Sequence, residues 1–231
     1  MPQPLLSVYQ QNAGNWLTTI DDKEIPSRVW TNPAIVSAAR TLKPQSVLDV
    51  GCGEGWLLRA LGETTQDYKP PLVRVGCDGV SDFISAARQK DPDGKYVTAS
   101  YDDLRSGTKL GQFELIIFNY SLFGKEEVVD LLRRMLHAIE PNGHLLIQTI
   151  HDSVFPDPGR WLLEDWQSMK GNYEGSYSWY YRSLGEWESD LEESGWSVVR
   201  CTETAKPDGQ KLSYIFTVAP RTLVRGNSKT F

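Results

Sequence analysis

Alternating glycines and two carboxylates stand together in the stretch VLDVGCGEG (47–55), and these residue types could hold a charged ligand. Asp49 precedes the loop, Glu54 lies in it, and no Lys or Arg occurs between positions 45 and 58. A helix N-terminus with free backbone N–H groups attracts anions, but Glu54 already places a negative charge there. Two carboxylates repel a pyrophosphate. They suit a ligand with an ammonium and a sulfonium group, which glycines allow to approach the backbone closely.

The spacing of the loop argues against two common phosphate-binding motifs. The glycines are Gly51, Gly53 and Gly55, whereas a G-x-G-x-x-G dinucleotide fingerprint would need glycine at the position of Trp56. A P-loop would need Gly-Lys-Ser/Thr, which the stretch lacks. An NAD(P)-dependent Rossmann oxidoreductase is the nearest rival enzyme class, because it shares the type of sheet and an acidic residue that binds ribose.

The chain alternates strand-like and helix-like segments up to residue 150, which predicts a doubly wound, mostly parallel α/β sheet with helices on both faces. The predicted strands are 46–50, 72–78, 95–100, 113–120 and 141–150, and the predicted helices are 55–63, 80–89 and 125–140. A helix over 183–195 follows. Two strands, 196–204 and 211–219, are joined by the turn AKPDGQ and predict an antiparallel hairpin at the end of the sheet.

These motifs resemble those of class I S-adenosylmethionine-dependent methyltransferases, in the small-molecule, ubiquinone-biosynthesis-like (methyltransferase type 11/12) branch. VLDVGCGEG is similar to the family motif E/D-x-G-x-G-x-G, VGCDG to the end of strand two, and EPNGHLLI to the turn before strand five. The resemblance implies a seven-stranded sheet of order 3-2-1-4-5-7-6. It also implies S-adenosyl-L-methionine as the cofactor, with S-adenosyl-L-homocysteine as its product.

The resemblance further implies a single methyltransferase domain over residues 1–231. Its expected parts are an N-terminal cap (1–44), a cofactor-binding core (45–150), an aromatic insert or lid (151–182), a helix with the C-terminal hairpin (183–219) and a tail (220–231).

By the same resemblance the cofactor lies over the ends of the first four strands. Asp49 lines its amino-acid end, and Asp78 accepts both ribose hydroxyls. In one register Ser100 with Tyr101 takes the adenine position, and in another Asp102 does. Arg28 is expected to bind the cofactor carboxylate, because the glycine loop has no cation. The full expected set is Tyr9, Arg28, Asp49, Gly51, Cys52, Gly53, Trp56, Asp78, Gly79, Ser100, Tyr101, Asp102, Asn119, Tyr120 and Ser121.

Methyl transfer is an in-line displacement on an activated methyl group, so the protein mainly supplies position and a dry site. An acceptor hydroxyl must also lose a proton. His151 directly follows the fifth predicted strand, and it is the one histidine that this topology points at the methyl group. We expect His151 to be a base or an orienting donor, with Tyr120 as a second catalytic candidate. A hydrogen-bonded histidine at a strand end is the alternative.

Residues 151–182 are rich in aromatic side chains. Such density between a strand and a helix predicts a lid whose rings stack on a flat or apolar acceptor, or else a small core that covers the sheet. The N-terminal segment resembles the cap that closes over the cofactor in the family. The expected substrate-binding residues are Trp16, Trp161, Trp179, Tyr181 and Arg182.

Composition limits the partners. The net charge is −6, and the short basic stretches LLRRML and RTLVRGNSK form no stripe of the kind that nucleic-acid binders show. No apolar run is long enough for a membrane span, and we read no signal peptide. Three widely spaced cysteines suggest neither a disulfide framework nor a metal site. A cytoplasmic monomer or homodimer that acts on a small molecule, without nucleic acid, membrane or metal, is expected.

The end of the fourth predicted strand, NYSLF, narrows the acceptor. It lacks the prolines of amino-methylating DNA enzymes and the glutamate pair of protein arginine enzymes. O-methylation of a small-molecule hydroxyl is therefore the favoured interpretation, while N-, C- and carboxyl-methylation stay open. A methyltransferase-like protein that binds the cofactor without turnover is an alternative beside the NAD(P) oxidoreductase.

Overall fold

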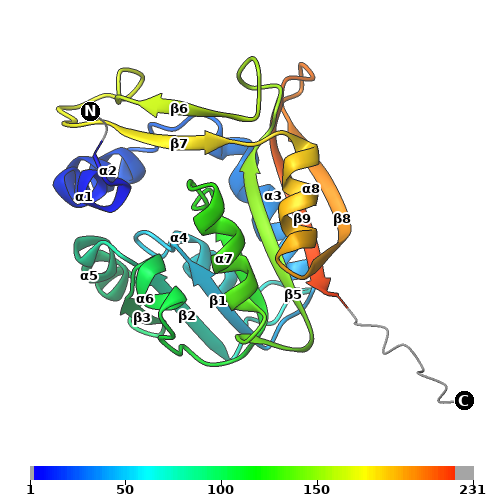
Figure 1. Ribbon diagram of the computed structural model, residues 1–231. Coiled ribbons are helices and arrows are strands. Elements are labelled where there is room, and N and C mark those ends of the chain that lie inside the picture. The colour runs from blue at the N-terminus through cyan, green and yellow to red at the C-terminus, as the bar shows by residue number, and fades with distance from the viewer. Residues whose placement is uncertain (1–2, 222–231) are drawn as a thin grey trace, which may run out of the picture.

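The computed structural model describes residues 3–221, and it contains a seven-stranded sheet with helices on both faces and a separate two-stranded sheet beside it (Figure 1). The strands are β1 (Ser46–Val50), β2 (Val73–Asp78), β3 (Lys95–Thr98), β4 (Phe113–Asn119), β5 (Ile139–Ile150), β6 (Arg160–Glu164), β7 (Tyr177–Tyr181), β8 (Trp196–Ala205) and β9 (Lys211–Pro220). The helices are α1 (Leu5–Gln11), α2 (Ala13–Asp21), α3 (Arg28–Thr41), α4 (Trp56–Leu61), α5 (Ser81–Lys90), α6 (Tyr101–Arg105), α7 (Glu126–Met135) and α8 (Leu184–Glu193).

The large sheet has the order β3-β2-β1-β4-β5-β9-β8. This is the expected order 3-2-1-4-5-7-6 once β6 and β7, which form the small sheet, are left out of the count. Strands β1 to β5 pair in parallel, and β9 runs antiparallel to both β5 and β8. The predicted fold class, including the C-terminal hairpin, is confirmed.

Successive side chains of the central strands point to opposite faces of the sheet and pack into two separate core layers. Val47 of β1 packs in a buried cluster with residues of α3, α4 and α5, while Leu48 and Val50 pack in a second cluster with residues of α6, α7 and α8. A parallel sheet covered on both faces excludes water along its length. Polar side chains on these strands therefore lie at the strand ends. In open α/β sheets, ligands bind at the carboxyl ends of the strands.

Two segments differ from the sequence-based prediction. The helix expected over 125–140 ends at Met135, and the chain joins the sheet at Ile139, because the Phe113 backbone N–H bonds the carbonyl of Ala138. His137 therefore lies after α7. The insert contains the strands β6 and β7, which the aromatic-rich sequence did not reveal.

The end of the expected tail, residues 222–231, lies outside the described residues. Within residues 3–221, no helix combines the length and the apolar character needed to cross a bilayer.

Candidate active site

A row of polar side chains crosses the large sheet at the edge where the parallel strands end. Asp49 is the last residue but one of β1, Asn119 ends β4, Gln148 lies near the end of β5, and Ser213 lies near the start of β9. In each strand, the polar residue lies two positions from a buried apolar residue of the core layer under α3 and α4. It therefore points to the same face of the sheet as that residue. Because neighbouring strands present the same face here, the four side chains line one edge of the protein beside the glycine loop.

The glycine loop between β1 and α4 has a backbone that glycine makes possible. Gly51 and Gly53 have φ of 75° and 54°. A Cβ on Gly51 would lie 2.5 Å from the Ser121 Cβ and 2.9 Å from the Tyr101 hydroxyl, so only glycine fits there. At Gly53, in contrast, a Cβ would meet no described heavy atom within 4 Å. The loop therefore packs tightly against the end of β4 and leaves open space at Gly53.

Asp49 lies beside this loop without a partner for its charge. The residue is 2% exposed, and its Oδ1 has no hydrogen-bond partner among the described residues. Burial, together with the nearby Asp78, raises the pKa of Asp49 from 3.8 to about 8. A buried carboxyl with a free oxygen is costly unless a donor or a cation meets it. Asp49 thus fits a cationic ligand group.

Asp78 ends β2 and faces the same loop. Its Oδ2 accepts a hydrogen bond from the Gly53 backbone N–H at 2.9 Å, and its Oδ1 accepts one from the Val80 N–H, also at 2.9 Å. Burial raises the pKa of Asp78, and these backbone hydrogen bonds oppose the rise. The two bonds fix the carboxylate between the glycine loop and Gly79, and its oxygens have further lone pairs for ligand hydroxyls.

The charge of Glu54 is paired with cations of the protein, which the acidic character of the loop did not suggest. Its Oε2 pairs with Arg59 at 2.5 Å and with Lys90 at 3.5 Å, and the carboxylate is 3% exposed. Arg59 follows Glu54 by five residues, just beyond the stretch without cations, and its side chain turns back along α4. The charge argument therefore rests on Asp49 and Asp78.

The segment after β3 favours one of the two expected registers. The Ser100 hydroxyl caps α6 in a capping box with Asp103, and the Ser100 Cα would lie 3.4 Å from a Cβ on Gly79. Tyr101 donates its hydroxyl proton to the Ser121 carbonyl at 2.7 Å and lies behind Gly51. Ser100 and Tyr101 thus adjoin the cofactor loop.

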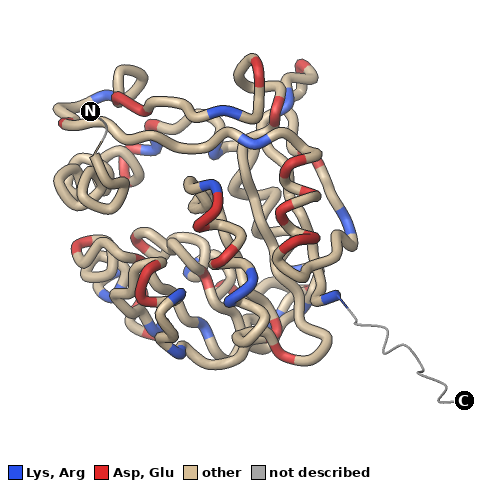
Figure 2. Tube along the Cα trace, viewed as in Figure 1, with Lys and Arg blue, Asp and Glu red and all other residues tan. Residues whose placement is uncertain are grey.

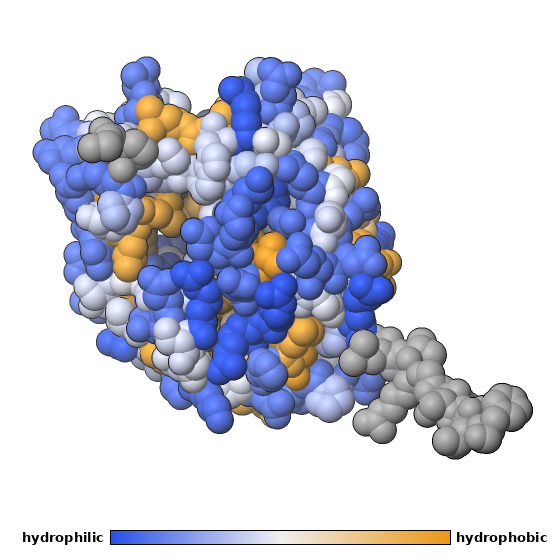
Figure 3. Space-filling model, in the orientation of Figure 1, coloured by the Kyte–Doolittle hydropathy of each residue, from blue (hydrophilic) through white to orange (hydrophobic). Residues whose placement is uncertain are grey.

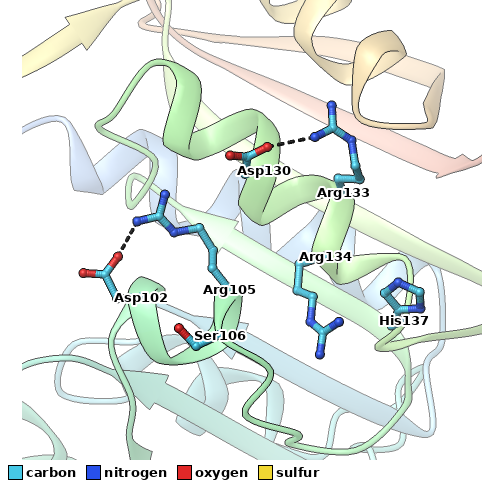
Figure 4. Close-up of a pocket in the computed structure, with 7 residues that line it drawn as sticks. All are labelled: Asp102, Arg105, Ser106, Asp130, Arg133, Arg134 and His137. Atoms are coloured by element: carbon cyan, nitrogen blue, oxygen red, sulfur yellow. Dashed lines mark hydrogen bonds and ion pairs between the residues drawn. The ribbon is translucent and has the colours of Figure 1, made fainter.

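Asp102 points elsewhere. It is exposed and pairs with Arg105 at the edge of a hollow of about 590 Å³ between α6 and α7 (Figure 4). The hollow is lined by Asp102, Arg105, Ser106, Asp130, Arg133, Arg134 and His137. None of these seven residues belongs to the glycine loop or to β2, so the geometry does not bring Asp102 to the Asp49–Asp78 pair.

Tyr120, the residue after β4, has a strained backbone that directs its ring inward. Its φ is 52°, which is costly for a residue with a large side chain. Burial raises the pKa of Tyr120, while nearby Ser213, Thr31 and Arg28 lower it. The next residue, Ser121, donates its hydroxyl proton to the Val50 carbonyl at 2.8 Å and joins β4 to β1. Strain of this kind concentrates at functional sites.

Arg28, at the start of α3, forms no ion pair with any of the described residues. Its guanidinium lies over the Trp56 ring at 5.7 Å, and within residues 3–221 no ion pair or hydrogen bond to it is formed. Burial lowers its pKa, against the raising effects of Glu54, Tyr120 and Tyr9. These neighbours place Arg28 beside the glycine loop, where it can bind a ligand carboxylate.

Replacing Arg28 with alanine should weaken the binding of S-adenosylhomocysteine about tenfold or more, because a charge-assisted hydrogen bond contributes about 1.5–3 kcal/mol. Isothermal titration calorimetry measures the change. Arg28→Lys should recover part of the affinity, and Arg200→Ala, at an exposed site on β8, is the matched control. Unaltered affinity in Arg28→Ala would exclude this role.

Gln148 and Thr31 were not predicted as site residues. The Gln148 Nε2 donates to the Thr31 carbonyl and to the Ser213 Oγ, both at 3.1 Å, which fixes the orientation of the amide. The Gln148 Oε1 and the Thr31 Oγ1 are buried and have no partner in the described part of the chain. The available signal was a single glutamine in the apolar run LLIQTI. The hydrogen bonds of Gln148 join α3, β5 and β9.

The N-terminal cap and the insert form one unit over the strand ends. The Asn12 side chain donates to the Glu174 carbonyl and accepts from the Glu174 N–H, at 2.7 and 2.8 Å. The Gln3 N–H bonds the Ser176 carbonyl at 2.8 Å. Leu6 of α1 lies 2.7 Å from the position of a Cβ on Gly79, so the cap reaches the end of β2. Figure 3 shows a hollow between this unit and the core below, with hydrophobic side chains at its rim.

Tyr9 and Trp16 belong to an aromatic cluster inside this unit. The Tyr9 ring packs against Trp16, Trp166 and Tyr177 with ring centres 5.5 to 5.6 Å apart. Burial raises the pKa of Tyr9, and the neighbouring charge of Asp78 adds to the rise, so Tyr9 also lies near the cofactor loop. The aromatic residues of the cap and insert thus form a small core that roofs the site.

Two expected substrate residues have structural partners instead. Arg182 is 2% exposed; it pairs with Asp190 at 2.7 Å and donates to the carbonyls of Gly124 and Lys125. Tyr181 is buried and donates its hydroxyl proton to the His151 carbonyl at 2.9 Å. All three guanidinium nitrogens of Arg182 donate within the protein, and the side chain is fully buried.

The remaining two expected residues are on the small sheet. Trp179 is partly buried against Phe155 and Tyr181, and Trp161 is exposed on β6 with its ring edge against Tyr180. Of the five expected substrate residues, Trp16 and Trp179 therefore lie in the cluster that contains Tyr9.

His151 is held by two hydrogen-bonded nitrogens. Its Nδ1 accepts from the Ser153 backbone N–H at 3.1 Å, and its Nε2 lies 3.1 Å from Glu203 Oε1. The ring stacks on Tyr214 at 4.1 Å. None of these partners belongs to the glycine loop or to the end of β2, and a backbone N–H occupies the lone pair that a base would use. Its role as a base stays a prediction that requires this bond to open.

A His151→Ala variant separates the two roles. A general base contributes on the order of 10²–10⁴ in rate, whereas loss of buried hydrogen bonds costs about 0.5–1.5 kcal/mol each. From the geometry we expect a lower Tm, with turnover within several-fold of wild type. Calorimetry and an initial-rate assay measure both, with His144→Ala, in the middle of β5, as control. A large loss of turnover at unchanged Tm would support His151 as the general base.

Comparison with known proteins decides the family. A sequence model described as "Methyltransferase domain" matches residues 29–200. The chain belongs to this methyltransferase family. The resemblance seen in the glycine loop and the strand ends is thereby confirmed, and this methyltransferase is an enzyme of the class that the loop predicted.

The individual relatives are distant. The chain is 22% identical over 184 residues to the tRNA U34 carboxymethyltransferase of Trichlorobacter lovleyi, covering 76% of this chain and 52% of that protein, about half its length. The DhpI structure in complex with SAH superimposes with a TM-score of 0.66 at 19% identity, over 93% and 94% of the two chains. The O-methyltransferase NcsB1 from neocarzinostatin biosynthesis does so with 0.59 at 18% identity, over 84% and 55%. These structures share the fold of this methyltransferase.

Proposed function

We propose that this methyltransferase transfers the methyl group of S-adenosyl-L-methionine to a hydroxyl oxygen of a small molecule. The observation that carries the choice of cofactor is the free, buried carboxylate oxygen of Asp49 beside Asp78 at the glycine loop. A ligand with an ammonium and a sulfonium group supplies the positive charge that these carboxylates lack. A dinucleotide would add two negative charges there instead.

The residues present fit this cofactor along its length. Asp49 and Asn119 offer oxygen acceptors to the ammonium, and Arg28 offers its guanidinium to the carboxylate. Asp78 accepts the ribose hydroxyls over the open space at Gly53. Ser100 and Tyr101 border the adenine. We infer one catalytic domain in which the cap, the core and the insert all contribute to the site.

In the reaction the acceptor oxygen attacks the methyl carbon in line with the carbon–sulfur bond. The new oxygen–carbon bond forms as the carbon–sulfur bond breaks, and the sulfur keeps the electron pair as a neutral thioether. The hydroxyl proton leaves to a base: Tyr120 is a candidate at the strand ends, and His151 could act only once its bond from the Ser153 N–H opens. The protein lowers the barrier mainly by alignment in a water-free site, which can contribute roughly 7–11 kcal/mol.

Two observations favour a small acceptor. The roof of the site is aromatic and tied to the cap, which suits a flat or apolar molecule. Lys and Arg are scattered singly among Asp and Glu rather than gathered in a stripe (Figure 2). The choice of oxygen rests on the NYSLF sequence after β4, and NcsB1 is a structural neighbour named as an O-methyltransferase.

The test is a tritiated-methyl transfer assay with S-adenosyl-L-methionine against a library of phenols, enols, alcohols, amines and carboxylic acids, with bulk tRNA as a further acceptor. We expect label in hydroxyl compounds. Label in amines or tRNA alone would overturn the acceptor and keep the cofactor. Calorimetry with S-adenosylhomocysteine and with NADH separates the cofactors, and heat with NADH alone would overturn both. Binding without label in any acceptor would identify a non-catalytic protein.

A further inference from the structure

The outer edge of β6 has no partner strand in the described part of the chain. β6 pairs with β7 on one side, from Arg160 opposite Tyr181 to Glu164 opposite Tyr177. Within residues 3–221, no backbone hydrogen bond joins the other edge of β6 to another segment. In Figure 1, β6 lies on the far side of β7 from the α1–α2 cap. An open strand edge is a template for pairing with another chain unless it is blunted.

Hydrophobic side chains surround this edge. Trp161 is 50% and Leu163 is 59% exposed on one face of β6, and Phe155, in the loop before β6, is 40% exposed. Figure 3 shows hydrophobic surface at this hairpin. Large apolar side chains that gather on a surface mark interaction sites, whereas single ones do not.

The sequence of the strand is complementary to itself. β6 reads Arg-Trp-Leu-Leu-Glu, with Leu162 at its centre. Antiparallel pairing of two copies about Leu162 places Arg160 opposite Glu164 of the partner subunit, and Trp161 opposite Leu163 of the partner subunit. Neither Arg160 nor Glu164 forms an ion pair within the described residues, although the Arg160 guanidinium bonds the carbonyls of Asp157 and Pro156 and Glu164 accepts from the Trp166 N–H. Opposite charges and apolar pairs directly across strands are stabilising.

We propose that β6 is the interface of a two-fold symmetric homodimer of this protein. The two small sheets then form one antiparallel sheet of order β7-β6-β6-β7 across the dimer axis. In a two-fold interface both subunits use the same surface, so every contact between two different residues occurs twice. Such a contact is closed and does not extend into a fibre. The joined strands belong to the insert, so the dimer links the roofs of two active sites. A short strand pair buries limited area, which gives a reversible dimer rather than an obligate one.

Charge reversal tests the pairing by sedimentation velocity over a range of protein concentrations. The wild type should show reversible dimers. Arg160→Glu and Glu164→Arg each put like charges opposite each other at both ends of the strand pair, and each should weaken the dimer on the order of tenfold. The double variant restores both pairs and should dimerise again. Equimolar mixing of the two single variants should form a heterodimer, because each then meets its opposite.

A second measurement tests whether the Leu162 residues of the two subunits lie opposite each other on the symmetry axis. In a Cys201→Ser background, Leu162→Cys should form an intermolecular disulfide under mild oxidation, because directly opposed Cβ atoms lie about 4.5–5.5 Å apart. Ser178→Cys, on β7, is the control and should form no intermolecular disulfide. A wild type that is monomeric at all concentrations overturns the proposal. So does a dimer that the single reversals leave unchanged, or a natively folded double variant that does not recover.

Discussion

Replacing Asp78 with alanine should weaken the binding of S-adenosylhomocysteine about a hundredfold or more. The carboxylate is oriented by two backbone hydrogen bonds of 2.9 Å, from Gly53 and Val80, toward the open space at the glycine loop. Two hydroxyl groups on one carboxylate are charge-assisted bonds of about 1.5–3 kcal/mol each, and about 1.4 kcal/mol corresponds to tenfold in affinity. Calorimetry, or displacement of a fluorescent analogue, measures the loss.

The control for this variant is Asp82→Ala. Asp82 is exposed in the first turn of α5, four residues beyond Asp78, and it removes the same charge without touching the loop. Asp78→Asn keeps the shape and one acceptor oxygen, and it should fall between Asp78→Ala and wild type. Equal affinity in Asp78→Ala and Asp82→Ala would remove Asp78 from the site.

Cofactor binding should strengthen as the pH rises toward 8, because Asp49 must ionise to meet a cation. Burial and Asp78 raise the pKa of Asp49 to about 8 in the free protein, from an ordinary value of 3.8. Below that pKa, binding of the cationic cofactor displaces the proton of Asp49. The affinity should therefore rise by up to about tenfold per pH unit, and it should level off above the pKa. Calorimetry in buffers of different ionisation enthalpy measures the proton release.

The stability of the free protein should change with pH in the opposite direction. A carboxyl whose pKa is raised in the folded state stabilises the fold fully below its unfolded pKa, and this contribution is lost as the pH rises through the folded pKa. Asp49 should therefore make the ligand-free protein less stable between about pH 4 and pH 8. In Asp49→Asn both the pH dependence of binding and this slope of Tm should shrink, whereas Asp208→Asn, in the β8–β9 turn, should keep them. Binding to Asp49→Asn with an unchanged pH profile would refute the assignment.

The fold could be predicted from sequence because local signals and sheet topology agree. Short apolar runs such as SVLDV alternate with amphipathic segments, and a hairpin of two strands joined by a Pro-Asp-Gly turn closes the sheet. The insert could not be predicted in this way. Tyr177–Tyr181 is almost all aromatic, so it has no period-two alternation, and β6 is held by its pairing with β7.

The site could be predicted where it follows from chain position, and not where it depends on tertiary contacts. Asp49 lies one residue before the end of β1, and Asp78 ends the neighbouring strand β2, so both lie beside the glycine loop. Whether a charged side chain is already paired depends on the folded structure. Asp190 pairs with Arg182, and Lys90 pairs with Glu54. The Gln148 amide becomes a site feature only because α3 crosses over β5, which no local pattern indicates.

The contact of Leu6 with Gly79 has a kinetic consequence. The cap lies directly over the end of β2, and through Asn12 and Glu174 it carries the insert above it. A donor molecule at the glycine loop is thus the lower of two layers, and an acceptor under the insert is the upper one. From this layering we expect a compulsory order of association, in which the donor enters first, the acceptor second, and the spent donor departs last, after the methylated compound has gone.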